Sequence, residues 1–209
     1  MNVAWRPIYS IMLYGQYLLD DYNSFHKEPA FKIYNRYGYQ AGIRIIEPFK
    51  VKNMFLLAEF NRVLPFTYSS SLRRQSYAGM NEPLAHPLGA NFREAVFQGY
   101  YRFRSLYINA SFSYALTGKD LTGTNYGTEI ILPDTTATNN LLSALDPPGL
   151  RTTIANFSIE AGYIINPKYN FVLSAGIRNR LYNNEFIHQE TNLIFIKIST
   201  NLLTTYNDF

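Results

Sequence analysis

Apolar and polar residues alternate along most of the chain, in segments of about ten residues. Between residues 106 and 117, every second position from Leu106 to Leu116 is apolar, and most of the positions between them are polar or small. Successive side chains of a β-strand point to opposite faces of a sheet, so this period of two predicts strands with one apolar face. The pattern predicts eight strands, at 8–19, 35–46, 54–64, 92–103, 106–117, 152–165, 171–181 and 191–203.

The connections between these segments alternate in length. Short turns at 47–53, 104–105 and 166–170 follow the second, fourth and sixth segments, and longer connections at 20–34, 65–91, 118–151 and 182–190 follow the others. If each strand pairs with the next one, all the longer connections lie at one end of the sheet. Bacterial outer-membrane barrels place short turns on the periplasmic side and long loops outside. A soluble sheet has no reason to separate connections by length.

The aromatic residues support the same interpretation. The chain has 18 Tyr and 15 Phe but one Trp. On the apolar parity they gather at the two strand ends: Tyr37, Tyr39 and Tyr114 near the long connections, and Tyr101, Phe103, Tyr163 and Phe171 near the short turns. Aromatic belts of this kind flank the apolar band of membrane barrels. A soluble antiparallel sandwich or barrel is the competing interpretation.

The first residues of the chain lead us to expect that it is a segment of a longer exported protein. A barrel must be exported, but residues 8–19 are interrupted by Tyr14, Gly15 and Gln16 and no small-residue cleavage site follows them. We therefore expect residues 1–209 to be a single all-β segment, a transmembrane antiparallel meander that forms the C-terminal portion of a larger outer-membrane barrel. A closed eight-stranded barrel is the alternative.

Composition and spacing exclude several kinds of chemistry. The absence of Cys excludes disulfides, and the net charge of +4 is not gathered in a basic block, so we expect no nucleic-acid partner. His26, His86 and His188 fall in three different connections without metal-ligand spacing. We predict no metal, no cofactor and no catalytic residue; an enzymatic barrel is the least favoured of the functions considered.

Charged residues on the polar parity form the first candidate site. They could line a lumen that attracts anionic solutes, or they could pair as Arg and Glu across neighbouring strands. The mixture of both signs favours pairing. These inward positions are Arg36, Arg44, Glu59, Glu94, Arg102, Glu160, Arg178, Arg180 and Lys197, of which Arg44, Glu59, Glu94, Arg102, Glu160 and Arg178 form the predicted ladder of luminal charges.

The connection 65–91 is the second candidate site. Pro83 and Pro87 stiffen it, and Leu84 and Leu88 favour burial, so we expect it to fold back over the mouth as an ordered lid or plug. Aromatic and planar polar side chains suit sugar binding, although they could instead satisfy the backbone of the loop. The candidate binding residues are Arg73, Arg74, Tyr77, Asn81, Glu82, His86 and Asn91.

Four stretches resemble one family. They are LYGQYLLDD at Leu13–Asp21, NRYGYQAGIR at Asn35–Arg44, YAGMNEPLAHPLGANFRE at Tyr77–Glu94 and NPKYN at Asn166–Asn170. Together they resemble the C-terminal part of Bacteroidetes outer-membrane proteins of the Wzi-like capsule-assembly and RemB-type gliding-motility group. The resemblance implies a location in the bacterial outer membrane and a non-enzymatic role in attachment of surface polysaccharide or in motility. A diffusion channel or transporter with a charged lumen is the alternative function.

Several expectations follow for the structure. The strands should form one meander, with the first and last strands as unpaired edges. The apolar parity should be exposed to membrane lipid, and the terminal strand ending at Phe209 should be recognised by the barrel-assembly machinery. Six positions test the exposure of that face: Ile108, Phe112, Phe157, Ile159, Ile196 and Ile198.

Overall fold

The computed structural model describes residues 1–21, 35–80, 82–138 and 147–200, and these are organised around β-strands. The long strands are β1 (Asn2–Ile8), β2 (Ile11–Asp21), β3 (Arg36–Ile46), β4 (Met54–Val63), β7 (Phe92–Phe103), β8 (Leu106–Lys119), β9 (Leu150–Asn166), β10 (Phe171–Asn183) and β11 (His188–Ser199). Two short strands, β5 (Ala78–Gly79) and β6 (Glu82–Pro83), and three short 3-10 turns, η1 (Pro48–Lys50), η2 (Arg73–Gln75) and η3 (Asp134–Thr136), lie in the connections. Within the described ranges, no helix has the length and apolar composition needed to cross a membrane.

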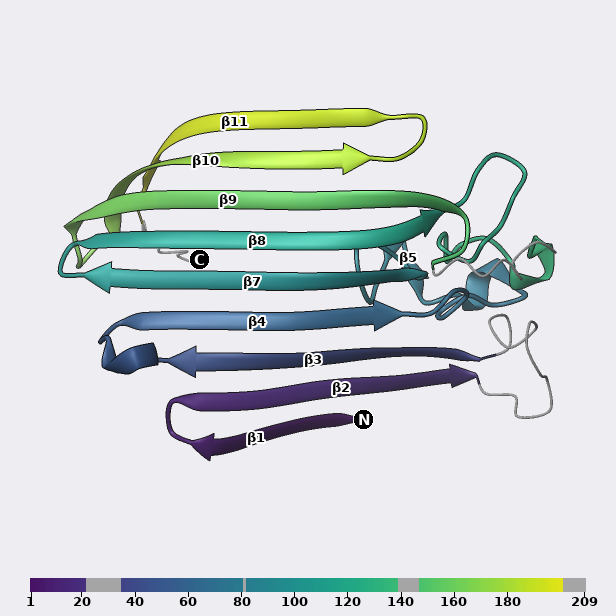
Figure 1. Ribbon diagram of the computed structural model, residues 1–209, viewed down its shortest axis with the longest axis horizontal. Helices are drawn as coiled ribbons and strands as arrows, with labels where there is room; N and C mark the ends of the chain where they lie inside the picture. Colours follow the sequence, from purple (N-terminus) through teal and green to yellow (C-terminus); the bar gives the residue numbers. More distant parts are fainter. Residues whose placement is uncertain (22–34, 81, 139–146, 201–209) are drawn as a thin grey trace, which may run out of the picture.

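The long strands form one antiparallel sheet in the order β1-β2-β3-β4-β7-β8-β9-β10-β11 (Figure 1). Each long strand is therefore paired with the next one along the chain, which confirms the predicted meander. The short strands β5 and β6 pair with each other in a separate two-stranded ribbon. The sheet has two faces, which we call the apolar face and the polar face after the residues that alternate along the strands.

The sheet has nine strands, so the prediction of eight was wrong at the N-terminal end. The segment expected as one strand at 8–19 contains a tight reversal at Tyr9 and Ser10, where Ile8 pairs with Ile11 and Trp5 pairs with Leu13. Alternation continues on both sides of this reversal, and it lacks the Gly or Asn that marks most two-residue hairpins. Periodicity alone therefore could not separate β1 from β2.

Short and long connections lie at opposite ends of the sheet, except for the short turn between β10 and β11, which lies at the end with the long connections. The turns at 9–10, 47–53, 104–105 and 167–170 lie at one end, and the long connections 64–91 and 120–149 lie at the other (Figure 1). The expected medium loop at 182–190 is shorter, because β10 continues to Asn183 and β11 begins at His188. The Asn184 carboxamide oxygen accepts hydrogen bonds from the N–H groups of Phe186 and Ile187, which closes this turn.

The two edges of the sheet are β1 and β11, and they do not pair with each other in the described part of the chain. This agrees with the expected open sheet, and the alternative of a closed eight-stranded barrel is not observed. Residues 201–203 of the last predicted strand lie outside the described residues, as does Phe209, so recognition of the C-terminus stays a prediction.

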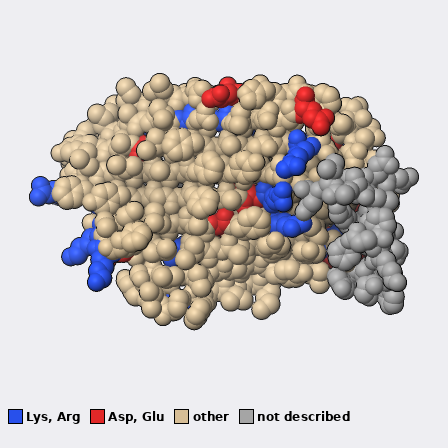
Figure 2. Space-filling view, viewed as in Figure 1, with Lys and Arg blue, Asp and Glu red and all other residues tan. Residues whose placement is uncertain are grey.

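The apolar face is exposed over the middle of the sheet. Of the six test positions, Ile108, Phe112, Phe157, Ile196 and Ile198 are exposed and Ile159 is half-buried, whereas Glu59, Glu94 and Glu160 on the other face are half-buried. Figure 2 shows a surface that is mostly uncharged over the strands, with isolated charged side chains of both signs on it and with Lys and Arg at the turn end. The two faces were thus assigned correctly from the sequence.

The buried core lies at the loop end of the sheet rather than between two sheets. Val63 and Phe92, at the ends of β4 and β7, pack with Ala90 and Ile130 from the two long connections. Tyr68, Ala78, Leu88 and Ile131 surround this cluster. The described parts of the long connections therefore pack against the strand ends at the loop end.

Candidate functional site

Carboxylates on the polar face are held by neutral partners. The Tyr14 hydroxyl donates to Glu59 Oε2 at 2.5 Å, and Asn61 Nδ2 donates to Glu59 Oε1 at 2.9 Å and to Glu94 Oε2 at 3.4 Å. These residues come from β2, β4 and β7, and the sheet register places them side by side. The guanidinium of Arg44 lies over the Tyr14 ring, 4.8 Å from its centroid.

A second group of polar contacts joins β8, β9 and β11. Glu160 Oε1 accepts a hydrogen bond from the Tyr107 hydroxyl at 2.7 Å and forms an ion pair with Lys197 Nζ at 2.8 Å. In the described part of the chain, Arg44, Arg102 and Arg178 form no ion pair with a carboxylate. The predicted Arg–Glu ladder is therefore replaced by contacts of Glu with Tyr, Asn, His and Lys.

The connection 64–91 folds back onto the polar face, as expected for a lid. His86 Nε2 lies 3.1 Å from Glu94 Oε2 on β7, and its ring stacks on Phe92 with 4.4 Å between centroids. The Leu88 N–H donates to His86 Nδ1 at 3.2 Å. Because Nδ1 acts as an acceptor, the neutral ring carries its proton on Nε2 and donates it to Glu94.

This fold-back leaves an open cavity of 660 Å³ between the loop and the polar face of β2, β3 and β4, which we call the sheet-side cavity. Gln16, Gln40 and Asn61 line it from the strands, and Tyr68, Ser70, Gln75, Tyr77 and His86 line it from the loop. The rings of Tyr68 and Tyr77 lie 6.0 Å apart between centroids. Burial, together with the nearby Asp20 carboxylate, raises the pKa of the Tyr68 phenol.

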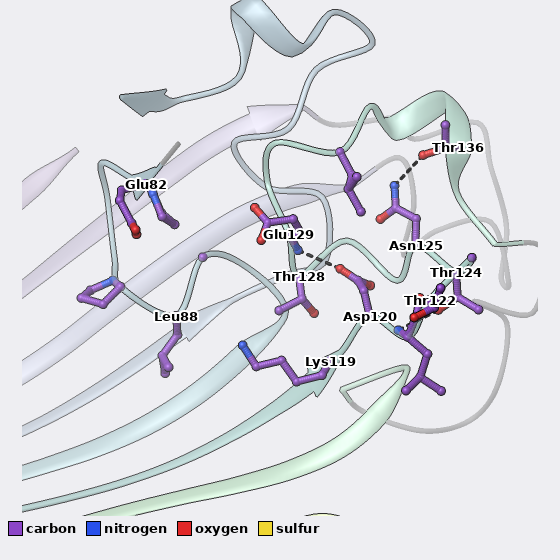
Figure 3. Close-up of a pocket in the computed structure, with 16 residues that line it drawn as sticks. Glu82, Leu88, Lys119, Asp120, Thr122, Thr124, Asn125, Thr128, Glu129 and Thr136 are labelled. Carbon is purple, nitrogen blue, oxygen red and sulfur yellow. Dashed lines mark hydrogen bonds between the residues drawn. The ribbon is translucent and has the colours of Figure 1, made fainter. Parts of the chain in front are cut away.

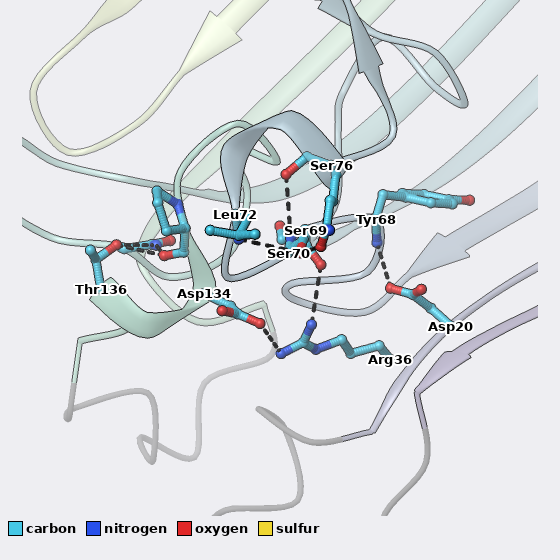
Figure 4. Close-up of polar contacts among 12 residues, drawn as sticks. Asp20, Arg36, Tyr68, Ser69, Ser70, Leu72, Ser76, Asp134 and Thr136 are labelled. Carbon is cyan, nitrogen blue, oxygen red and sulfur yellow. Dashed lines mark hydrogen bonds and ion pairs between the residues drawn. The ribbon is translucent and has the colours of Figure 1, made fainter.

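Polar contacts fix the loops around this cavity (Figure 4). Arg36 forms an ion pair with Asp134 at 2.7 Å and donates to the Ser69 carbonyl oxygen at 3.2 Å, so it joins β3 to both long connections. The Tyr68 N–H donates to Asp20 Oδ2 at 2.9 Å, which ties the loop to the end of β2. The lid is thus held on one side by the partly buried Arg36–Asp134 pair and on the other by the exposed Asp20 carboxylate.

A second cavity, of 770 Å³, lies among the loops themselves, and we call it the loop cavity (Figure 3). Its wall includes Glu82, Lys119, Asp120, Glu129 and the hydroxyl groups of several threonines. Asp120 accepts hydrogen bonds from the N–H groups of Tyr126 and Glu129 at 2.5 and 2.8 Å, which fixes the connection after β8.

The half-buried Asp120 carboxyl gives this connection a pH dependence. Burial raises its pKa above the ordinary 3.8, against the opposing effect of the N–H donors. An acid with a raised pKa stabilises the fold below its ordinary pKa and loses that contribution as the pH rises through its folded-state pKa. We expect the amide resonances of Tyr126 and Glu129 to titrate with a midpoint above 3.8, and Asp120→Asn to abolish this titration. A midpoint at or below 3.8 would contradict the assignment.

The seven loop residues proposed from the sequence are placed in different environments. Tyr77 and His86 line the sheet-side cavity, and Glu82 lines the loop cavity. Arg73 and Arg74 are exposed and line neither cavity, Asn91 is fully buried, and Asn81 lies outside the described residues. The strand residues Gln16, Gln40 and Asn61 were missed; the only available signal was that each is a planar amide on the polar parity.

The walls of the two cavities present side chains that can hydrogen-bond a hydroxylated molecule. No group of three or more potential metal ligands occurs among residues 1–21, 35–80, 82–138 and 147–200. Amides, hydroxyls and tyrosine rings instead offer hydrogen bonds and flat apolar surfaces to a ligand. No family model, no curated protein and no solved structure matches this chain.

Proposed function

We propose that this protein is a bacterial outer-membrane β-sheet protein that holds surface polysaccharide at its loop end, in capsule attachment or gliding motility, and that it is not an enzyme. In this proposal the nine strands are part of a larger barrel wall. The apolar face contacts lipid, the turn end faces the periplasm and the loop end faces the cell exterior.

The exposed apolar face supports the membrane location. Phe97, Phe112 and Phe157 are cross-strand neighbours on β7, β8 and β9, and all three are exposed. Soluble proteins avoid such continuous apolar surfaces, whereas lipid favours them. On the same face, Arg62 and Arg93 are neighbours near the loop end, where lipid headgroups would lie.

The sheet-side cavity is the single observation that carries the binding role. It lies at the loop end, and its wall combines planar amides with tyrosine rings. Planar polar groups hydrogen-bond pairs of sugar hydroxyls, and aromatic rings stack on the apolar faces of sugar rings. Its 660 Å³ is within the range of ordinary ligand pockets.

The binding role is tested with surface polysaccharide extracted from the producing bacterium and labelled with a fluorophore. We expect the purified protein in detergent to bind this extract, and replacement of residues 71–87 by a short Gly-Ser linker to weaken binding at least tenfold. A matched variant with Tyr9 and Ser10 replaced at the turn end should bind like the unmodified protein. Equal binding by the loop variant, or no binding at all, would contradict the proposal.

A diffusion channel is the second candidate, favoured by the exposed Arg178 on the polar face. The fold-back of the connection 64–91 across β2, β3 and β4 opposes it. Planar-bilayer recordings separate the two functions. We expect low conductance that rises when residues 71–87 are removed, whereas a high and steady conductance of the unmodified protein would favour the channel.

A further inference from the structure

We infer that the sheet-side cavity selects an uncharged, hydroxyl-rich segment of a glycan and excludes an acidic one. This inference rests on the proposed polysaccharide-binding function and adds the class of ligand and the residues that choose it.

A row of planar polar side chains crosses the sheet beneath the lid. Gln16 on β2 is paired with Gln40 on β3, Gln40 with Asn61 on β4, and Asn61 with Glu94 on β7. The Gln16 side chain is exposed and forms no hydrogen bond within the described part of the chain. Gln16 therefore offers one acceptor and two donors in one plane, which matches vicinal hydroxyl groups rather than a full charge. The neighbouring amides Gln40 and Asn61 are already hydrogen-bonded to Glu59 and shape the wall beside it.

Tyrosine rings face this row from the lid. Tyr77 is 55% exposed although it stands beside Tyr68 in a cavity, so its ring is open to a ligand. The Tyr68 phenol adds an uncharged hydroxyl to this wall. A sugar ring between the amide row and these tyrosines would have both its hydroxyl edge and its apolar face covered.

The charges around the cavity disfavour an acidic ligand. No Lys or Arg belongs to the residues that line it, and the carboxylate of Asp20 does. His86, which does line it, contacts the Glu94 carboxylate. On β3, Arg36 pairs with Asp134 and Arg44 stacks on Tyr14. A uronate or phosphate would lose hydration in the cavity without gaining a cation, and it would meet the field of Asp20.

The test divides the extracted surface polysaccharide into neutral and acidic fractions by anion exchange and measures the affinity of each for the purified full chain. We expect the neutral fraction to bind, and Tyr77→Ala and Gln16→Ala each to weaken it about tenfold, the scale of one good binding contact. Tyr169→Ala, an exposed tyrosine at the turn end, serves as the control and should have no effect.

A gain of binding makes the test sharper. Gln16→Lys places a cation in the cavity at an exposed strand position, and we expect it to confer binding of the acidic fraction that declines as salt is added. Carboxyl reduction of the acidic fraction should likewise allow it to bind the unmodified protein.

The outcomes separate this inference from the proposed function. Tighter binding of the acidic fraction by the unmodified protein, or binding of the neutral fraction that is insensitive to Tyr77→Ala and Gln16→Ala, would overturn the inference and leave polysaccharide binding intact. Absence of binding by both fractions would overturn both.

Discussion

Arginine in place of Phe112 is expected to destabilise the protein in a lipid bilayer by about 2–4 kcal/mol, the cost of Arg near the midplane on the lipid face of a membrane barrel. Phe112 lies on the apolar face near the middle of β8, and its ring stacks on Phe97 with 6.4 Å between centroids. In water, an exposed Phe replaced by Arg would cost little. The measurement is urea unfolding in lipid vesicles, followed by fluorescence of Trp5, the one tryptophan of the chain.

Ser111→Arg provides the matched control, because Ser111 is the preceding residue of β8 and belongs to the polar face. We expect this substitution to change the free energy of unfolding by less than about 0.5 kcal/mol, as at other partly exposed polar positions. If Phe112→Arg and Ser111→Arg have equal small effects, and the protein stays monomeric without detergent or lipid, the apolar face does not contact lipid and the membrane location is wrong.

The positions of the strands could be predicted from the sequence because the two faces of this sheet have different environments. A register shift of one residue would exchange all apolar and polar positions, so the alternation fixes both the strand and its faces. The segment expected at 106–117 is observed at Leu106–Lys119, and that expected at 171–181 is observed at Phe171–Asn183. The hairpin at Tyr9 and Ser10 escaped detection because the alternation runs through it without the Gly or Asn of most two-residue hairpins.

The sheet-side cavity could not be predicted from the sequence in the same way. Gln16, Gln40 and Asn61 come from three strands, and only the pairing register brings them into one row. The partners of the Glu residues were missed for a related reason. A Glu carboxylate on the polar face accepts hydrogen bonds from any donor, and here the donors are Tyr14, His86 and Lys197 rather than the expected Arg residues. Asn91 was expected to bind ligand because it is a loop amide, but its burial gives it a structural role.

Alanine in place of Asn91 is expected to destabilise the loop end by about 2–4 kcal/mol, because buried polar groups that lose a partner cost about 1–3 kcal/mol each. Asn91 Nδ2 lies 2.9 Å from the Gly118 and Pro148 carbonyl oxygens and from Thr128 Oγ1. It thereby joins the end of the first long connection to both ends of the second. The backbones are close together here, because a Cβ added at Gly118 would lie 1.7 Å from the Pro148 carbonyl oxygen.

Hydrogen exchange of the Gly118 and Ala90 amides measures this effect, since their N–H groups donate to the Asn91 and Thr128 carbonyl oxygens. We expect exchange through local opening to accelerate roughly 30-fold to several hundredfold, which corresponds to the same range of free energy.

Two controls separate the lost hydrogen bonds from backbone strain. Asn91 has a φ of 57°, a conformation that glycine adopts freely and alanine does not, so Asn91→Gly should accelerate exchange less than Asn91→Ala. Asn170, with a φ of 47° in an exposed turn, carries the backbone strain without the buried contacts, and Asn170→Ala should leave the loop end unchanged. Exchange of the Gly118 amide at the unmodified rate in Asn91→Ala would show that the two long connections hold together without this residue. In that case the shape of both cavities would have to depend on the Arg36–Asp134 ion pair and on the packing of Val63, Phe92 and Ile130 instead.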